Sequence, residues 1–225
     1  MKNITITIDG VGGAGKGTTA KGVAKKLNYT HIDSGAIYRA VTFFLHKKNV
    51  NYNASQEVID EALKNLNIDF NNQGMVLMNN KNIENKIRTD EIDDLVFEYA
   101  KRGVIRNFVK KEQHKLLKNG GVVIDGRDTG SVVFPKAELK IFITCDIKER
   151  ARRRAIQYGV INDPKKVIEI ENDFKNRDYQ DEHRKHSPLI IPKNAVIIDT
   201  TNLTIDEQIE KVYKLALQKI KEKND

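Results

Sequence analysis

A glycine-rich loop near the start of the chain holds the first residues whose types and spacing could do chemistry. Residues 10–18 read GVGGAGKGT, with the spacing Gly10-x4-Gly15-Lys16. Glycines allow backbone N–H groups to surround an oxyanion, and a helix that begins after them points its positive end at the same place. Lys16 can then reach the outer phosphates of a nucleotide. An ordinary glycine-rich turn is the alternative. We predict a nucleotide-phosphate site that consists of Gly10, Val11, Gly12, Gly13, Ala14, Gly15, Lys16, Gly17 and Thr18.

The residue after Lys16 narrows the class of protein. Gly17 stands there, and the hydroxyl comes one position later, at Thr18. This Gly-Lys-Gly-Thr order resembles the loop of nucleoside monophosphate kinases more than that of GTPases or motor ATPases. A GTPase would also need an Asn-Lys-x-Asp motif that reads guanine, and the Asn-Lys pairs at 80–81 and 85–86 both lack the aspartate.

Two further segments could hold a second phosphoryl group and a metal ion. Asp33 and Ser34 end a strand pattern, where they would also make a good helix N-cap. A cap does not account for Arg39, which lies about one turn into the helix and could form a bidentate contact with a phosphate. Another apolar run ends at Asp125, a carboxylate suited to the water shell of Mg²⁺ beside a phosphate loop. The predicted magnesium ligands, partly through water, are Thr18 and Asp125.

Arginines and acids gather in the later part of the chain. Arg127 and Asp128 follow the strand that ends at Asp125, at the sheet edge where ligands bind in such folds. Residues 150–154 read RARRR, and planar guanidinium groups clamp a transferring phosphoryl better than ammonium groups do. A solvated helical face is the alternative for this run. Residues 177–184 read RDYQDEHR, which alternates anion-binding and hydroxyl-binding side chains, as a ribose with a phosphate would require.

Strand and helix patterns alternate along most of the chain. Strands are expected near 4–9, 29–33, 122–125, 139–144 and 195–199, and helices over 16–27, 36–48, 91–100, 104–118, 147–158, 164–178 and 204–222. This order predicts a parallel sheet that is covered on both faces. Residues 50–90 break the rhythm with one helix at about 55–66 and two short strand-like pieces, which indicates a small α+β insertion.

Composition excludes several classes of protein. The 225 residues fit one domain with an insertion, no run approaches the ~18 apolar residues of a membrane span, and the pattern from Ile4 to Ile8 indicates a strand and not a signal-peptide core. The single cysteine, Cys145, excludes an intrachain disulfide. We expect a cytoplasmic protein, and a monomer because no long apolar seam is left over.

The charge balance favours small anionic ligands. Lys+Arg 39 against Asp+Glu 31 gives a net charge of +8, which suits either nucleic acid or small phosphorylated molecules. The lysines are densest on helical stretches, where a solvated face is expected, and no basic strand with interleaved aromatic residues occurs. We therefore expect neither nucleic acid nor a membrane as partner, and a basic nucleic-acid-binding ATPase stays as the distant alternative.

Taken in order, the motifs resemble the bacterial cytidylate kinase family. They are GVGGAGKGTTAKGVAKKL, IDSGAIYRA, VVIDGRDTGSVVFPKAELKIF, ERARRR and RDYQDEHRKHSPL, and they span essentially the whole chain. The resemblance implies an α/β P-loop NTPase fold with three layers and a five-stranded parallel sheet. It also implies one kinase domain over 1–225, with a core at about 1–50, 90–150 and 190–225, a monophosphate-binding insertion at about 51–90 and a lid at about 150–189.

The same resemblance implies an activity and the residues that carry it. The reaction would move the γ-phosphoryl group of ATP, with Mg²⁺, to CMP or dCMP, giving ADP and CDP or dCDP. The catalytic residues would be Lys16, Arg127, Arg150, Arg153 and Arg154. The residues that bind the acceptor would be Asp33, Ser34, Arg39, Arg106, Arg127, Asp128, Arg177, Asp181 and Arg184.

Three departures from the family's pattern stand out. Val11 replaces a proline in the loop, and Gly103 replaces a proline three residues before Arg106. Phe97 replaces a serine that lies near the cytosine in the family, so one polar contact to the base is in doubt. Another kinase for small molecules, of the UMP/CMP, adenylate or shikimate type, is the nearer alternative, but the DGRDTGSVVFP segment argues against it.

Overall fold

The computed structural model describes residues 3–71, 74–117 and 120–224. These form two compact units: the first unit comprises residues 3–31 and 120–224, and the second unit comprises residues 32–117. The strands are β1 (Thr5–Gly10), β2 (Thr30–Asp33), β3 (Ile68–Phe70), β4 (Val76–Met78), β5 (Lys81–Asn82), β6 (Val122–Asp125), β7 (Leu139–Thr144) and β8 (Val196–Asp199). The helices are α1 (Lys16–Leu27), α2 (Ser34–Lys47), α3 (Gln56–Leu63), α4 (Asp90–Ala100), α5 (Gly103–Leu116), α6 (Ile147–Gln157), α7 (Pro164–His183) and α8 (Ile205–Asn224), with short turns η1 (Glu84–Lys86) and η2 (Thr129–Val133).

A five-stranded sheet in the order β2-β6-β1-β7-β8 forms the core. The central strand β1 pairs in parallel with β6 along one edge and with β7 along the other. It is buried along its whole length, so both faces of the sheet are covered there. The register sets Ile8 of β1 opposite Asp125 of β6. Because parallel strands end at the same sheet edge, the phosphate loop after β1 lies beside the carboxylate that ends β6. The predicted fold class is confirmed.

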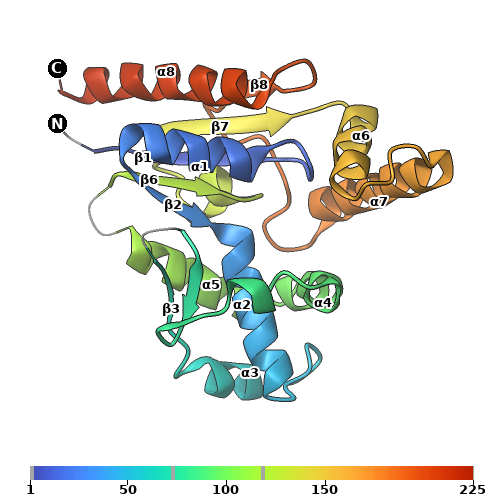
Figure 1. Ribbon diagram of the computed structural model, residues 1–225. Helices are drawn as coiled ribbons and strands as arrows, with labels where there is room; N and C mark the ends of the chain where they lie inside the picture. Colours follow the sequence, from blue (N-terminus) through green and yellow to red (C-terminus); the bar gives the residue numbers. More distant parts are fainter. Residues whose placement is uncertain (1–2, 72–73, 118–119, 225) are drawn as a thin grey trace. The chain divides into compact units, whose positions relative to one another are not determined.

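In the first unit, helix α8 lies beside α1, and α6 lies beside α7 (Figure 1). Gly22 allows the close approach of the first pair, because a Cβ there would lie 2.3 Å from the Cδ1 atom of Ile209. The small side chains of α1, Ala20 and Ala24, are buried in the same core. This packing fixes the start of α1, and with it the phosphate loop.

The second unit joins helices to a small antiparallel sheet in the order β3-β4-β5. Of its longest helices, α2 buries a mainly apolar face, and α5 buries apolar residues together with the polar side chains of Arg106, Glu112 and Gln113. The Tyr99 hydroxyl donates to the Val50 carbonyl at 2.7 Å, which ties α4 to the segment after α2. Residues 50–90 contain helix α3 and the short strands β3 and β4, where one helix and two strand-like pieces were expected.

Most predicted elements are present, and the differences have physical causes. Helix α7 continues to His183, five residues beyond the predicted end at 178, because the polar segment that follows keeps helical geometry without an apolar period. The short β5, η1 and the π-helical turn η2 were not predicted, since each is too short to show a period. Helix α5 starts one residue early and ends at Leu116, and residue 118 of its predicted range lies outside the described residues. Of the helices in the described part of the chain, none has the length and apolarity needed to cross a bilayer.

Candidate active site

The phosphate loop closes around the start of helix α1. Strand β1 ends at Gly10, where only glycine fits, because a Cβ would lie 1.9 Å from the Ile143 carbonyl oxygen and φ is +146°. Gly15 precedes the helix with φ +92°. Lys16 is 6% exposed, and its Nζ donates to the Val11 carbonyl oxygen at 2.6 Å. The nine predicted loop residues therefore run from the end of β1 through a turn into the first residues of α1, and the lysine side chain folds back across that turn.

Lys16 lies in a cluster of charges. Burial lowers its pKa well below the ordinary value, Arg127 lowers that pKa further, and the carboxylates of Asp125 and Asp181 act in the opposite direction. Arg177 also lowers it. A buried ammonium group surrounded by guanidinium groups is stabilised by an added anion, so this cluster suits a polyphosphate.

Arg127 and Asp181 join the segment after β6 to helix α7. Arg127 Nε donates to Asp181 Oδ2 at 2.8 Å, and an Arg184 nitrogen lies 3.4 Å from the other oxygen of that carboxylate. Burial acts to raise the pKa of Asp181, but Arg127, Arg184 and Arg177 hold it below its usual value. Arg184 also lies 3.8 Å from the buried Asp128. Five predicted acceptor residues thus fall in one charged group, namely Arg127, Asp128, Arg177, Asp181 and Arg184.

The arginines in residues 150–154 of α6 differ in burial and in the groups that they contact. Arg150 is 5% exposed and its Nη1 donates to the Gly12 carbonyl at 3.0 Å, so it lies directly against the loop. Its Nε is buried and has no hydrogen-bond partner among the described residues. Arg154 stacks over the rings of Phe174 and Tyr158 at 5.8 Å and 5.4 Å. The alternative prediction, a solvated helical face, applies among these arginines to Arg152, whose side chain is 55% exposed.

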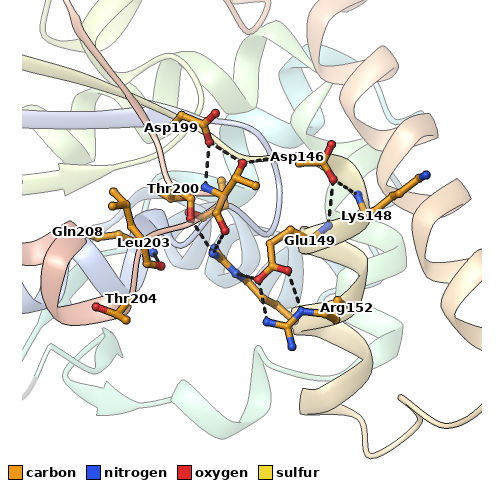
Figure 2. A network of polar contacts seen from close by, with 12 residues as sticks. Asp146, Lys148, Glu149, Arg152, Asp199, Thr200, Leu203, Thr204 and Gln208 are labelled. Atoms are coloured by element: carbon orange, nitrogen blue, oxygen red, sulfur yellow. Dashed lines mark hydrogen bonds and ion pairs between the residues drawn. The ribbon is translucent and has the colours of Figure 1, made fainter.

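Arg153 belongs to a different network. Its Nε donates to Glu149 at 2.9 Å, and its Nη2 donates to the Thr200 carbonyl at 2.7 Å. Glu149 and Thr200 are labelled in Figure 2. Asp146 caps α6 through the backbone N–H of Lys148. The network ties α6 to the loop after β8, so the predicted action of Arg153 on the transferred group stays a prediction that requires these bonds to break.

We expect this network to give the protein part of its resistance to acid. Hydrogen bonds from Arg152, then from Arg153, lower the pKa of Glu149 from 4.5 to about 2. A lowered pKa in the folded state means that the stabilisation is complete above pH 4.5 and is lost as the pH falls through about 2. The urea midpoint of Glu149→Gln should therefore lie below that of the wild type at neutral pH, and this gap should close towards pH 2.

The matched control is Glu182→Gln, which removes an exposed carboxylate from α7. Its midpoint should follow the wild type across the same range. A gap for Glu149→Gln that stays constant with pH would contradict the assigned role.

The remaining predicted acceptor residues belong to the second unit. Asp33 caps α2 by accepting from the Ala36 N–H at 2.9 Å, which confirms the cap, and it also pairs with Arg88 at 2.7 Å. Burial acts to raise the pKa of Asp33, but Arg88 holds it below the usual value. Ser34 accepts from Gln113 at 2.6 Å, inside the same unit.

The two arginines of the second unit that were predicted to bind the acceptor each form a hydrogen bond within that unit. Arg39 donates from Nε to Asp93 at 2.6 Å. Arg106 is buried, donates to the Ala100 carbonyl at 3.1 Å, and lies 5.3 Å from the Tyr38 ring centroid. Their roles toward an acceptor stay predictions.

Asp125 lies beside the phosphate loop, as a ligand of a magnesium ion held mainly by phosphates would, and the role of Thr18 stays a prediction. Asp125 is 8% exposed, its Oδ2 lies 3.6 Å from a Cβ placed on Gly17, and its Oδ1 lies 2.7 Å from Nε2 of His31. Thr18 is exposed in the first turn of α1. Within residues 3–71, 74–117 and 120–224, no group of three or more His, Cys, Asp or Glu side chains could hold a metal ion. One carboxylate beside a phosphate loop matches Mg²⁺, which is usually bound by one or two carboxylates, water and substrate phosphates.

Sequence reasoning missed Asp9, a buried carboxylate directly before the loop. It accepts hydrogen bonds from the backbone N–H and the hydroxyl of Thr129 at 2.8 Å and 2.7 Å, and from the Gly130 N–H at 2.7 Å. Burial raises its pKa, against the lowering effect of these bonds. Asp9 thus fastens the segment that carries Arg127 and Asp128 to the end of β1. Nothing in the local sequence indicates these partners, since they lie 120 residues away.

Removal of the Asp9 carboxylate should destabilise the protein strongly. Asp9→Ala would leave three buried donors without acceptors, and each costs about 1–3 kcal/mol. We expect the free energy of unfolding in urea to fall by about 3 kcal/mol or more. Asp173→Ala, which removes an exposed carboxylate from α7, serves as the control and should cost under about 1 kcal/mol. Equal losses for the two variants would contradict this account.

Comparison with known proteins decides the family. The sequence model described as cytidylate kinase matches residues 6–218. The chain belongs to the cytidylate kinase family. A cytidylate kinase of Fusobacterium nucleatum is 42% identical over 224 residues, which cover 98% of this chain and 100% of that protein. One from Ligilactobacillus salivarius is 41% identical over 225 residues, with 96% and 97% covered.

Membership of the cytidylate kinase family makes the chain an enzyme, and it confirms the resemblance drawn from the motifs. Among solved structures, an uncharacterized protein from Eubacterium ventriosum matches with a TM-score of 0.50 and 18% identity, covering 96% of this chain and 99% of that one. This likeness concerns the fold alone. It agrees with the α/β fold described above.

Proposed function

We propose that the chain is a cytoplasmic, monomeric kinase that transfers the γ-phosphoryl group of ATP to CMP or dCMP, giving ADP and CDP or dCDP. The observation that supports it best, beside the family, is the gathering of cations at the loop. Lys16 belongs to the loop, and Arg127 and Arg150 lie against it, so each of the three can neutralise phosphate charge. No partner other than these small nucleotides is proposed.

The chemistry needs positioning and charge stabilisation more than covalent work by the protein. The acceptor is a phosphate oxygen that is already ionised at neutral pH, so no side chain has to act as general base. Lys16 and the arginines would neutralise the charge that grows between the two nucleotides. Mg²⁺, when bound at Asp125 and Thr18, would draw negative charge from the β- and γ-phosphates.

Helix α7 would serve as part of the lid. It brings the Phe174 ring over the loop, where a Cβ placed on Gly13 would lie 2.7 Å from the ring. A cover of this kind excludes water, which would otherwise compete with the acceptor and turn the enzyme into an ATPase.

An acceptor screen tests the proposal. Formation of ADP from MgATP would be followed with CMP, dCMP, UMP or AMP, and without acceptor. We expect the fastest rates with CMP and dCMP. Equal rates with and without every monophosphate would contradict the proposal, and RNA or DNA would then be added to test the alternative of a nucleic-acid-stimulated ATPase.

The UMP rate addresses base selection at Phe97. The Phe97 ring is half-buried on α4, with the Lys101 ammonium 4.3 Å from its centroid. A phenylalanine side chain has no polar atom, so it offers a base no hydrogen bond of the kind that serine would. We propose that the loss of a polar contact here relaxes discrimination against UMP. Phe97→Ser would then lower the rate with UMP relative to the rate with CMP.

A further inference from the structure

Helix α7 turns one face towards the phosphate loop. Phe174, Asp178 and Asp181 have the spacing i, i+4 and i+7, which places them on the same side of a helix. Phe174 is 6% exposed and packs against the glycines of the loop. The carboxylates of Asp178 and Asp181 are 14% and 9% exposed. This face therefore combines one apolar anchor with two carboxylates.

Asp178 forms hydrogen bonds with both the phosphate loop and helix α6. Its Oδ1 accepts from the Gly12 N–H at 3.4 Å, and its Oδ2 accepts from Arg150 Nη1 at 2.6 Å. Arg150 Nη1 also donates to the Gly12 carbonyl at 3.0 Å. One carboxylate thus joins three segments that are far apart in the sequence.

The position of Arg150 depends on this carboxylate. A guanidinium group that is 5% exposed is costly unless an opposite charge pairs with it. Asp178 supplies that charge, and the Phe174 ring, 5.4 Å from the guanidinium carbon, supplies the surface on which Arg150 lies. The pair leaves Arg150 Nε as a buried donor without a partner among the described residues.

We propose that Asp178 is a positioning residue for phosphoryl transfer, which holds the Arg150 guanidinium against the phosphate loop, where it can neutralise charge on the transferred group. This inference rests on the proposed function. Asp178 itself touches neither nucleotide in this account and acts through Arg150. A misplacement of such a group by about 1 Å can lower the rate by about 10²-fold.

Asp178→Asn is the direct test. The amide keeps the shape of the side chain, but it removes the charge and sets an NH₂ group opposite one of the two donors, Gly12 N–H or Arg150. We expect kcat to fall by about 10- to 100-fold, with the KM values for ATP and CMP changed by less than about threefold. Asp173→Asn removes an exposed charge from the same helix and should leave kcat within about twofold.

A double substitution separates positioning from mere support of the fold. If Asp178 acts through Arg150, adding Asp178→Asn to Arg150→Ala should lower kcat by less than about threefold further. Effects that multiply in full, or a kcat close to that of the wild type in Asp178→Asn, would overturn the inference. A lower melting temperature with an unchanged kcat for the folded enzyme would do the same.

The two proposals fail in different ways. A wild-type enzyme that forms no CDP from CMP would overturn the proposed function, and the inference with it. A wild-type enzyme that forms CDP, beside an Asp178→Asn enzyme with unchanged kcat, would overturn the inference alone.

Discussion

Lys16→Ala should lower kcat by about 10³-fold or more while the protein stays folded. The Lys16 ammonium is the buried cation of the loop, donates to the Val11 carbonyl, and lies among Arg127, Asp125 and Asp181. In the folded protein its burial is costly, since burial lowers its pKa, so removal of the charge should not unfold the chain. The loss should therefore appear in catalysis and not in stability.

Steady-state rates with MgATP and CMP, together with a melting curve, check this prediction. Lys21→Ala, on the exposed side of the same helix α1, is the matched control and should keep kcat within about twofold. A rate near that of the wild type in folded Lys16→Ala would contradict the assignment of the loop.

Arg127→Ala should lower kcat/KM for CMP by about 10²- to 10³-fold. The guanidinium pairs with Asp181 through Nε, and its Nη2 lies 3.6 Å from a Cβ placed on Gly12, so it stands between the acceptor residues and the loop. Arg127→Lys keeps the charge without the planar fork, and we expect it to recover only part of the loss. The KM for ATP should change much less than the KM for CMP.

The control for Arg127 is Arg152→Lys, which changes an exposed arginine of α6 in the same way. Its kcat/KM should stay within about twofold of the wild type. Equal rises in the KM for ATP and in the KM for CMP with Arg127→Ala would contradict the assignment of this residue to the acceptor.

The loop and the sheet could be predicted because their signals are local. Gly10, Gly15 and Lys16 stand at the fixed spacing of a phosphate loop, and the strand before the loop and the helix after it show a clear pattern. The contact that requires glycine at position 10 is with Ile143, and the immediate sequence does not show it. The family resemblance used such ordered motifs, and the match over residues 6–218 confirms it. The C-terminal part of α7 was not predicted because this helix is mostly polar. A polar helix that packs through few of its side chains shows no clear apolar period in its sequence.

Contacts across long stretches of sequence could not be predicted from single motifs. Asp9 looks like a polar interruption of a strand, and its partners Thr129 and Gly130 become apparent only when β1 and β6 are paired. Asp178 lay within a quoted motif, but its bond to Gly12 spans 166 residues. The i, i+4 and i+7 spacing of Phe174, Asp178 and Asp181 was the one signal in the sequence. It indicates a shared helix face only once α7 is known to extend to His183.

The most direct test of the central claim follows the transferred group itself. ATP labelled with ³²P at the γ-position would be incubated with the enzyme, Mg²⁺ and CMP, and the products would be separated. The account predicts that the label appears in CDP, at the β-phosphate, in an amount equal to the ADP formed. Label found in inorganic phosphate, at the same rate with and without CMP, would contradict it.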